Sequence, residues 1–64
     1  MVKINGEYLD IAGKTVAEYV QDAGYDTQRI AVERNGKILP RAQFSETVLT
    51  ENDSVEVVSF VGGG

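Results

Sequence analysis

Two Asn-Gly dipeptides constrain the fold of this chain more than any other feature. Asn5-Gly6 and Asn35-Gly36 each lie between short segments in which apolar and polar residues alternate. This dipeptide favours the two-residue turn of a β-hairpin, because both of its positions accept a positive φ angle. The sequence therefore predicts two hairpins, and in the first of them Val2 should lie opposite Leu9 on the core face.

A short helix is expected between the two hairpins. Thr15 and Glu18 have the spacing of a capping box, in which each side chain bonds the backbone N–H of the other residue. The apolar residues that follow recur at helical spacing and form one stripe: Val16, Tyr19, Val20 and Ala23. Gly24 can end the helix in the left-handed region, which gives a length of roughly ten residues.

The second hairpin should pair Val32 with Leu39 and end at Pro40, which has no backbone N–H to donate to a strand ladder. Phe44 is the expected anchor of the connection that follows. The core is expected to contain nine apolar residues in particular: Val2, Ile4, Leu9, Ile11, Val16, Val20, Val32, Leu39 and Val57.

The last segment, residues 54–61, is predicted to form a strand after a turn at residues 51–53. Val55 and Val57 should point inward, and Val58 and Phe60 should point to the opposite, helix-free face. The first and last strands are expected to be neighbours at the centre of one mixed sheet. This order of elements predicts an α+β fold of the ubiquitin-like β-grasp type, with one main helix on one face of the sheet.

Composition excludes several kinds of chemistry. The 64 residues include no Cys, His or Trp, so thiolate nucleophiles, disulfides and Ser-His-Asp triads are absent, and no metal or cofactor site is expected. A formal charge of −4 argues against nucleic acid as a partner. The sequence contains neither a signal peptide nor a membrane-spanning stretch, and a small domain without disulfides is typical of the cytoplasm.

Gly62-Gly63-Gly64 is the most unusual group in the chain. We expect residues 1–61 to form the folded domain and residues 62–64 a flexible tail. Glycines have no Cβ, so a glycine tail can enter a narrow channel and present its terminal carboxylate to the active site of a partner. A frayed end or a remnant of an expression vector is the alternative reading.

Other surface residues give weaker signals. Val58 and Phe60 suit a docking patch just ahead of the tail, although they could instead cover a thin sheet, and Phe60 could tuck inward. Scattered basic residues could contact a partner but are more typical of a solvated surface: Lys3, Lys37 and Arg41. Two pairs of carboxylates are interpreted as turn and cap residues: Glu51 with Asp53, and Asp22 with Asp26.

Across almost its whole length the chain resembles the thiamine-biosynthesis sulfur carrier proteins, the ThiS family. The resemblance is carried by these elements in order: Asn5-Gly6-Glu7, Thr15-Val16-Ala17-Glu18, Ala31-Val32-Glu33-Arg34-Asn35-Gly36, Leu39-Pro40-Arg41 followed by Phe44, Asn52-Asp53-Ser54, and the glycine end. Two features depart from the family pattern. Gly62 is an extra glycine ahead of the last two, and Phe44 occupies a position where Trp is also common.

The resemblance implies a carrier and not an enzyme. In that family a ubiquitin-activating-like adenylyltransferase adenylates the carboxylate of the last glycine, which becomes a thiocarboxylate and gives sulfur to thiazole synthase. Gly64 would carry the sulfur, with Gly63 as its required neighbour, and the donor would be an enzyme such as a cysteine desulfurase. Sulfur carriers for molybdopterin, tRNA or cysteine, a ubiquitin-like protein modifier and a plain binding module remain alternatives.

Overall fold

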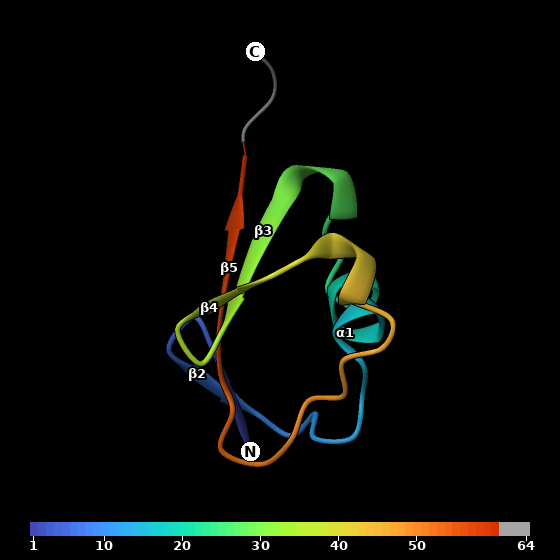
Figure 1. Ribbon diagram of the computed structural model, residues 1–64. Coiled ribbons are helices and arrows are strands. Elements are labelled where there is room, and N and C mark those ends of the chain that lie inside the picture. The colour runs from blue at the N-terminus through green and yellow to red at the C-terminus, as the bar shows by residue number, and fades with distance from the viewer. Residues whose placement is uncertain (61–64) are drawn as a thin grey trace.

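The computed structural model describes residues 1–60, and they form one mixed sheet with a helix packed on one face (Figure 1). The strands are β1 (Val2–Ile4), β2 (Glu7–Leu9), β3 (Ile30–Arg34), β4 (Lys37–Leu39) and β5 (Ser54–Ser59). The helices are α1 (Val16–Asp22) and the 3₁₀ turns η1 (Thr27–Arg29) and η2 (Arg41–Gln43). Val61 and the predicted tail at residues 62–64 lie outside the described residues.

The five strands follow the order β2-β1-β5-β3-β4. β1 and β5 run parallel at the centre, and every other neighbouring pair is antiparallel. The predicted α+β arrangement of the β-grasp type is therefore confirmed, including the adjacency of the first and last strands. β5 is paired with β1 only near its start, at Ser54 and Val55, whereas its pairing with β3 continues to Ser59, so β3 is the strand that holds the end of β5.

Both hairpins form at the Asn-Gly dipeptides. Asn5 has φ 50° and Gly6 has φ 87°, and the second dipeptide repeats this geometry. The predicted pairing of Val2 with Leu9 is confirmed. The Asn5 side chain also has a function in the sheet, because its amide donates to the Val57 carbonyl at 3.2 Å and its oxygen accepts from the Val57 N–H at 2.8 Å. It continues the β1–β5 pairing beyond the point where β1 ends.

The helix begins at the predicted capping box. The Glu18 N–H donates to the Thr15 hydroxyl at 3.1 Å, and the Thr15 N–H donates to the Glu18 carboxylate at 2.8 Å. The predicted length of ten residues is wrong, because α1 has seven residues and ends at the Ala23 cap. Ala23 is exposed and does not belong to the buried stripe, since the chain turns away there and Gly24 takes φ 84°.

The core lies between the sheet and α1. Its buried apolar residues are Val2, Ile4, Val16, Val20, Ile30, Val32, Phe44, Leu49, Val55 and Val57. Three residues predicted for the core are only partly buried: Leu9, Ile11 and Leu39. Leu9 and Leu39 lie on the two edge strands, where no further strand covers their outer side. Burial of each fully enclosed side chain contributes on the order of 1.5–3 kcal/mol to stability.

The connection from η2 to β5 completes the core without forming a strand of its own. Phe44 is buried, as predicted for the anchor of this connection, and Leu49, which was not among the predicted core residues, is even more enclosed. Backbone bonds tie this connection to the start of the helix: the Val16 N–H donates to the Thr47 carbonyl, and the Leu49 N–H donates to the Lys14 carbonyl. The connection therefore packs with α1 on the same face of the sheet.

Candidate functional site

The predicted carrier glycines, Gly62, Gly63 and Gly64, lie outside the described residues, so the structure describes the base from which they extend. β5 remains paired up to its end, where Ser59 lies opposite Ile30. The next residue, Phe60, donates its backbone N–H to the Arg29 carbonyl at 2.7 Å. The chain is therefore held against β3 up to the last residue that the structure describes.

Val58 and Phe60, the predicted docking residues, are both exposed. Val58 is 55% exposed and lies opposite Ala31, and Phe60 is 57% exposed. Phe60 does not take the alternative, inward position. Val55 and Val57 are buried as predicted, so the alternation along β5 turns Val58 to the face of the sheet that points away from α1, here called the outer face.

A third exposed apolar side chain is Ile38 on β4, which lies opposite Glu33 on the outer face. It is 68% exposed and, together with Ala31 and Phe60, lines a shallow hollow at the edge of the sheet. Ile38 was not among the partner-binding residues predicted from the sequence. The signal was present, because pairing Val32 with Leu39 on the core face requires Ile38, one residue earlier, to point outward. We refer to Ile38, Val58 and Phe60 as the apolar patch.

Arg41 borders this hollow from the core side of the sheet edge. Its Nε donates to the Thr27 carbonyl at 2.7 Å, and its Nη2 donates to the Ile30 carbonyl at 3.4 Å. These bonds hold the guanidinium over the turn that leads into β3. A positive charge therefore lies at the same end of the sheet as the last residue of β5.

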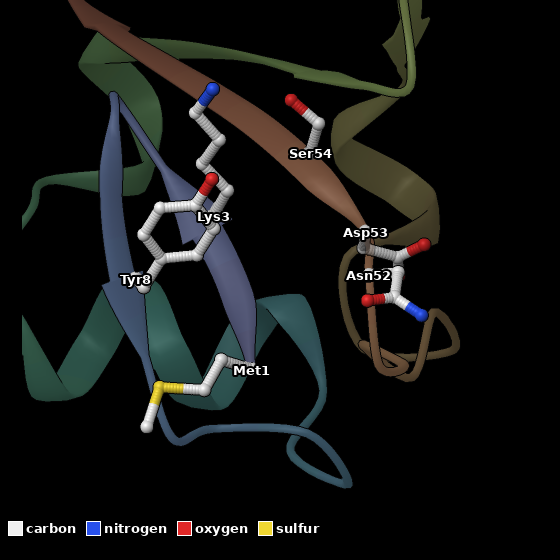
Figure 2. A pocket seen from close by; sticks show the side chains of 6 residues that line it. All are labelled: Met1, Lys3, Tyr8, Asn52, Asp53 and Ser54. Atoms are coloured by element: carbon white, nitrogen blue, oxygen red, sulfur yellow. The ribbon is translucent and has the colours of Figure 1, made fainter.

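A second hollow lies at the other end of the outer face, where β5 begins. Figure 2 shows Lys3 and Tyr8 side by side on β1 and β2, with Met1 and Ser54 at the margins of the same hollow. The Lys3 ammonium is 5.8 Å from the centre of the Tyr8 ring, a cation–π distance. Since a strand rises about 3.3 Å per residue, this hollow is roughly 17 Å from the end of β5.

Asp53 is the one buried charged residue in the part of the chain that the structure describes. Its carboxylate accepts from Arg34 Nε at 3.0 Å, from Asn35 Nδ2 at 3.0 Å and from the Thr50 N–H at 2.9 Å. Burial by itself would raise the pKa of the Asp53 carboxyl, but the hydrogen bonds outweigh it and hold that pKa below its ordinary value. The bond to Thr50 fits the predicted role as a turn residue, whereas the contacts with Arg34 and Asn35 were not foreseen.

The other carboxylates singled out from the sequence also hold local structure. Asp26 accepts from the Gln28 N–H at the start of η1, and Glu51 accepts from the amine of Met1. Asp22 accepts from Lys14 Nζ at 2.8 Å, and this contact raises the pKa of the lysine.

Among residues 1–60 no group of three His, Cys, Asp or Glu side chains could hold a metal ion. Within the same span, no helix has the length and apolar character needed to cross a membrane.

Comparison with known proteins gives a consistent result. The ThiS family matches residues 2–64. The sulfur carrier protein ThiS of Bacillus subtilis is 35% identical over an alignment that covers both chains completely. A crystal structure of the thiamine biosynthesis protein ThiS from Geobacter metallireducens superimposes with a TM-score of 0.77 at 30% identity, covering 98% of this chain and 97% of that one.

Thiazole synthases are also among the relatives. The thiazole synthase of Paramagnetospirillum magneticum is 37% identical over 95% of this chain. The chain spans about one fifth of the length of the two thiazole synthases that it matches, 19% of one and 20% of the other. In those proteins a segment similar to this domain therefore belongs to a much longer chain.

Proposed function

The chain belongs to the ThiS family, and from that membership we propose that it is a sulfur carrier for thiamine biosynthesis whose sulfur is carried on the carboxylate of Gly64. The observation that supports this most directly is the extent of the family match, which runs through residue 64 and so includes the terminal glycines. A folded domain of residues 1–61 with a tail of residues 62–64 is part of the proposal.

The proposed chemistry explains why the last residues are glycines. A carboxylate resists nucleophiles, so a partner adenylyltransferase must first activate it. One Gly64 oxygen attacks the α-phosphate of ATP and pyrophosphate leaves. The persulfide of a donor such as a cysteine desulfurase then displaces AMP and forms an acyl disulfide. A thiol attacks the donor's sulfur in this bond, which releases the thiocarboxylate and leaves the donor in a disulfide with that thiol. Because Gly63 and Gly64 have no Cβ, catalytic groups can approach the reacting carbonyl from either side.

In this scheme the chain is a co-substrate and its partners are the enzymes. The amino-acid composition agrees with a co-substrate role, because the chain contains no Cys or His to act as nucleophile or general base. The acceptor of the sulfur would be thiazole synthase, and relatives of that name that contain a similar segment support this partner. The cytoplasm is the proposed compartment, because adenylation requires ATP.

The fold contributes a rigid base for the tail. β5 is paired with β3 up to Ser59, and the Phe60 N–H is bonded to the Arg29 carbonyl, so the last described residues before the proposed tail are held in place. Val58 and Phe60, exposed just ahead of the tail, are the proposed contacts with the adenylyltransferase. A partner that holds these side chains would also define where the Gly64 carboxylate can reach.

Intact mass spectrometry tests the proposal. The protein is incubated with ATP, a cysteine desulfurase with cysteine, a thiol reductant and the adenylyltransferase, and a matched sample lacks ATP. We expect an ATP-dependent mass gain equal to the exchange of one oxygen for sulfur, located at Gly64 by fragmentation. A chain without Gly64 should show no gain. Absence of the gain from the intact chain would contradict the proposal, and lysine-linked conjugates of higher mass would indicate a protein modifier instead.

A further inference from the structure

Two carboxylates face each other across the centre of the outer face. Glu33 on β3 lies directly opposite Glu56 on β5, and both residues are exposed. Neither takes part in any of the ion pairs found among residues 1–60. The basic residue on the neighbouring part of this face, Lys3, has its ammonium over the Tyr8 ring.

This pairing is unfavourable for the isolated domain. Opposed residues in a sheet have Cβ atoms about 4.5–5.5 Å apart, and like charges at that distance are destabilising. The register cannot shift to separate them, because a slip of one residue would turn Val32 and Val57 from the core into water. Packing on one face of the sheet therefore holds two negative charges together on the other.

The carboxylates border the apolar patch directly. Two residues further along, Ala31 and Val58 form the next pair on the same face, and Ile38 lies opposite Glu33 on its other side. An apolar surface with a charged border is the usual composition of a protein interface, in which apolar groups supply contact area and charges select the partner.

We propose that Glu33 and Glu56 together receive an arginine of the adenylyltransferase, whose apolar side chains cover the apolar patch. This inference rests on the proposed function and names the chemistry of its partner surface. An arginine fits better than a lysine, because its planar guanidinium can donate to both carboxylates at once. The formal charge of −4 on the chain would also speed encounter with such a basic surface.

The test compares Glu33→Gln/Glu56→Gln with the matched control Glu46→Gln. Glu46 is also exposed, but it belongs to the connection that packs with α1, away from the outer face. Binding to the purified adenylyltransferase is measured by calorimetry without ATP at low and moderate salt. We expect the double variant to bind on the order of tenfold more weakly, with a smaller salt dependence, and to melt at the same or a higher temperature. The control should bind like the unchanged protein.

The inference and the proposed function can fail separately. Unchanged affinity and salt dependence in the double variant would overturn the arginine site, even if the unchanged protein still acquires sulfur. If the double variant binds weakly while the unchanged protein never acquires sulfur, the docking face stands and the carrier chemistry does not. Absence of any binding by the unchanged protein would overturn the docking site, and the mass measurement would still decide the carrier chemistry.

Discussion

Arg34 donates from Nε to the Asp53 carboxylate at 3.0 Å and thereby joins the end of β3 to the turn that precedes β5. Only 7% of the Asp53 side chain is exposed, whereas the arginine is 33% exposed, so the carboxylate is the enclosed member of the pair. With the bonds from Asn35 and Thr50, this contact fixes the start of the strand that leads to the tail.

Asp53→Asn should destabilise the fold and remove part of its acid sensitivity. The pKa of Asp53 is lower in the folded chain than in the unfolded chain, where an aspartate has a pKa of about 3.9. Its contribution to stability is therefore present above that pH and is lost as the pH falls toward the folded pKa. We expect a loss of about 2 kcal/mol at pH 7 and a smaller loss in acid.

Denaturant unfolding at several pH values measures this effect. The control is Asp10→Asn, an exposed carboxylate that makes no ion pair within the described part of the chain. If Asp53→Asn and Asp10→Asn had the same stability at neutral pH, the hydrogen bonds to Asp53 would contribute nothing to the fold.

Comparison of Asn5→Gly with Asn5→Ala should separate two contributions of Asn5 to stability. One is the pair of side-chain hydrogen bonds to Val57, and the other is tolerance of a positive φ angle. Glycine accepts the positive φ but loses both bonds to Val57, for an expected cost of about 1–2 kcal/mol. Alanine loses the bonds and also strains the turn, which adds about 1 kcal/mol. Thermal and denaturant unfolding should rank the proteins as unchanged, Gly variant, Ala variant; equal stability of the two variants would show that φ strain at Asn5 is negligible.

Phe60→Ala should impair partner binding much more than folding. Its side chain is largely exposed, so we expect a stability change within about 1 kcal/mol but clearly slower acquisition of sulfur. Leu49→Ala is the contrasting variant, because Leu49 is enclosed in the core and its truncation should cost about 2–5 kcal/mol. Circular dichroism and intact mass measured on the same samples distinguish the two effects. A Phe60→Ala protein that is loaded at the normal rate would remove Phe60 from the docking face.

Gly63→Val should block sulfur acquisition without changing the unfolding free energy, because a branched side chain beside the terminal residue obstructs approach to the reacting carbonyl. Gly24→Ala provides the opposite control. Gly24 has φ 84° at the end of α1, so alanine there should cost about 1–2 kcal/mol of stability while sulfur acquisition continues. The readouts are denaturant unfolding and intact mass. Normal sulfur acquisition by Gly63→Val would contradict the prediction, because it would show that the valine side chain does not obstruct approach to the reacting carbonyl.

Local sequence signals determined much of this protein. The Asn-Gly dipeptides and the Thr15–Glu18 capping box act within a few residues, so both hairpins, their registers and the start of α1 could be predicted. The exposure of Val58 and Phe60 followed from the same alternation once Val55 and Val57 were assigned to the core. The terminal glycines, which carry the proposed function, were evident from the sequence alone.

Tertiary structure decided what depends on segments far apart in the chain. Leu9 and Leu39 have the sequence pattern of core residues, but they lie on edge strands and are only partly buried. Leu49 is enclosed because the connection from η2 to β5 is hydrogen-bonded to the start of the helix. The contact of Arg34 with Asp53 and the opposition of Glu33 and Glu56 exist only because β3 pairs with β5 in one register. That register is set by burial of the valines on the inner face, a cooperative property of the whole sheet that no local pattern contains.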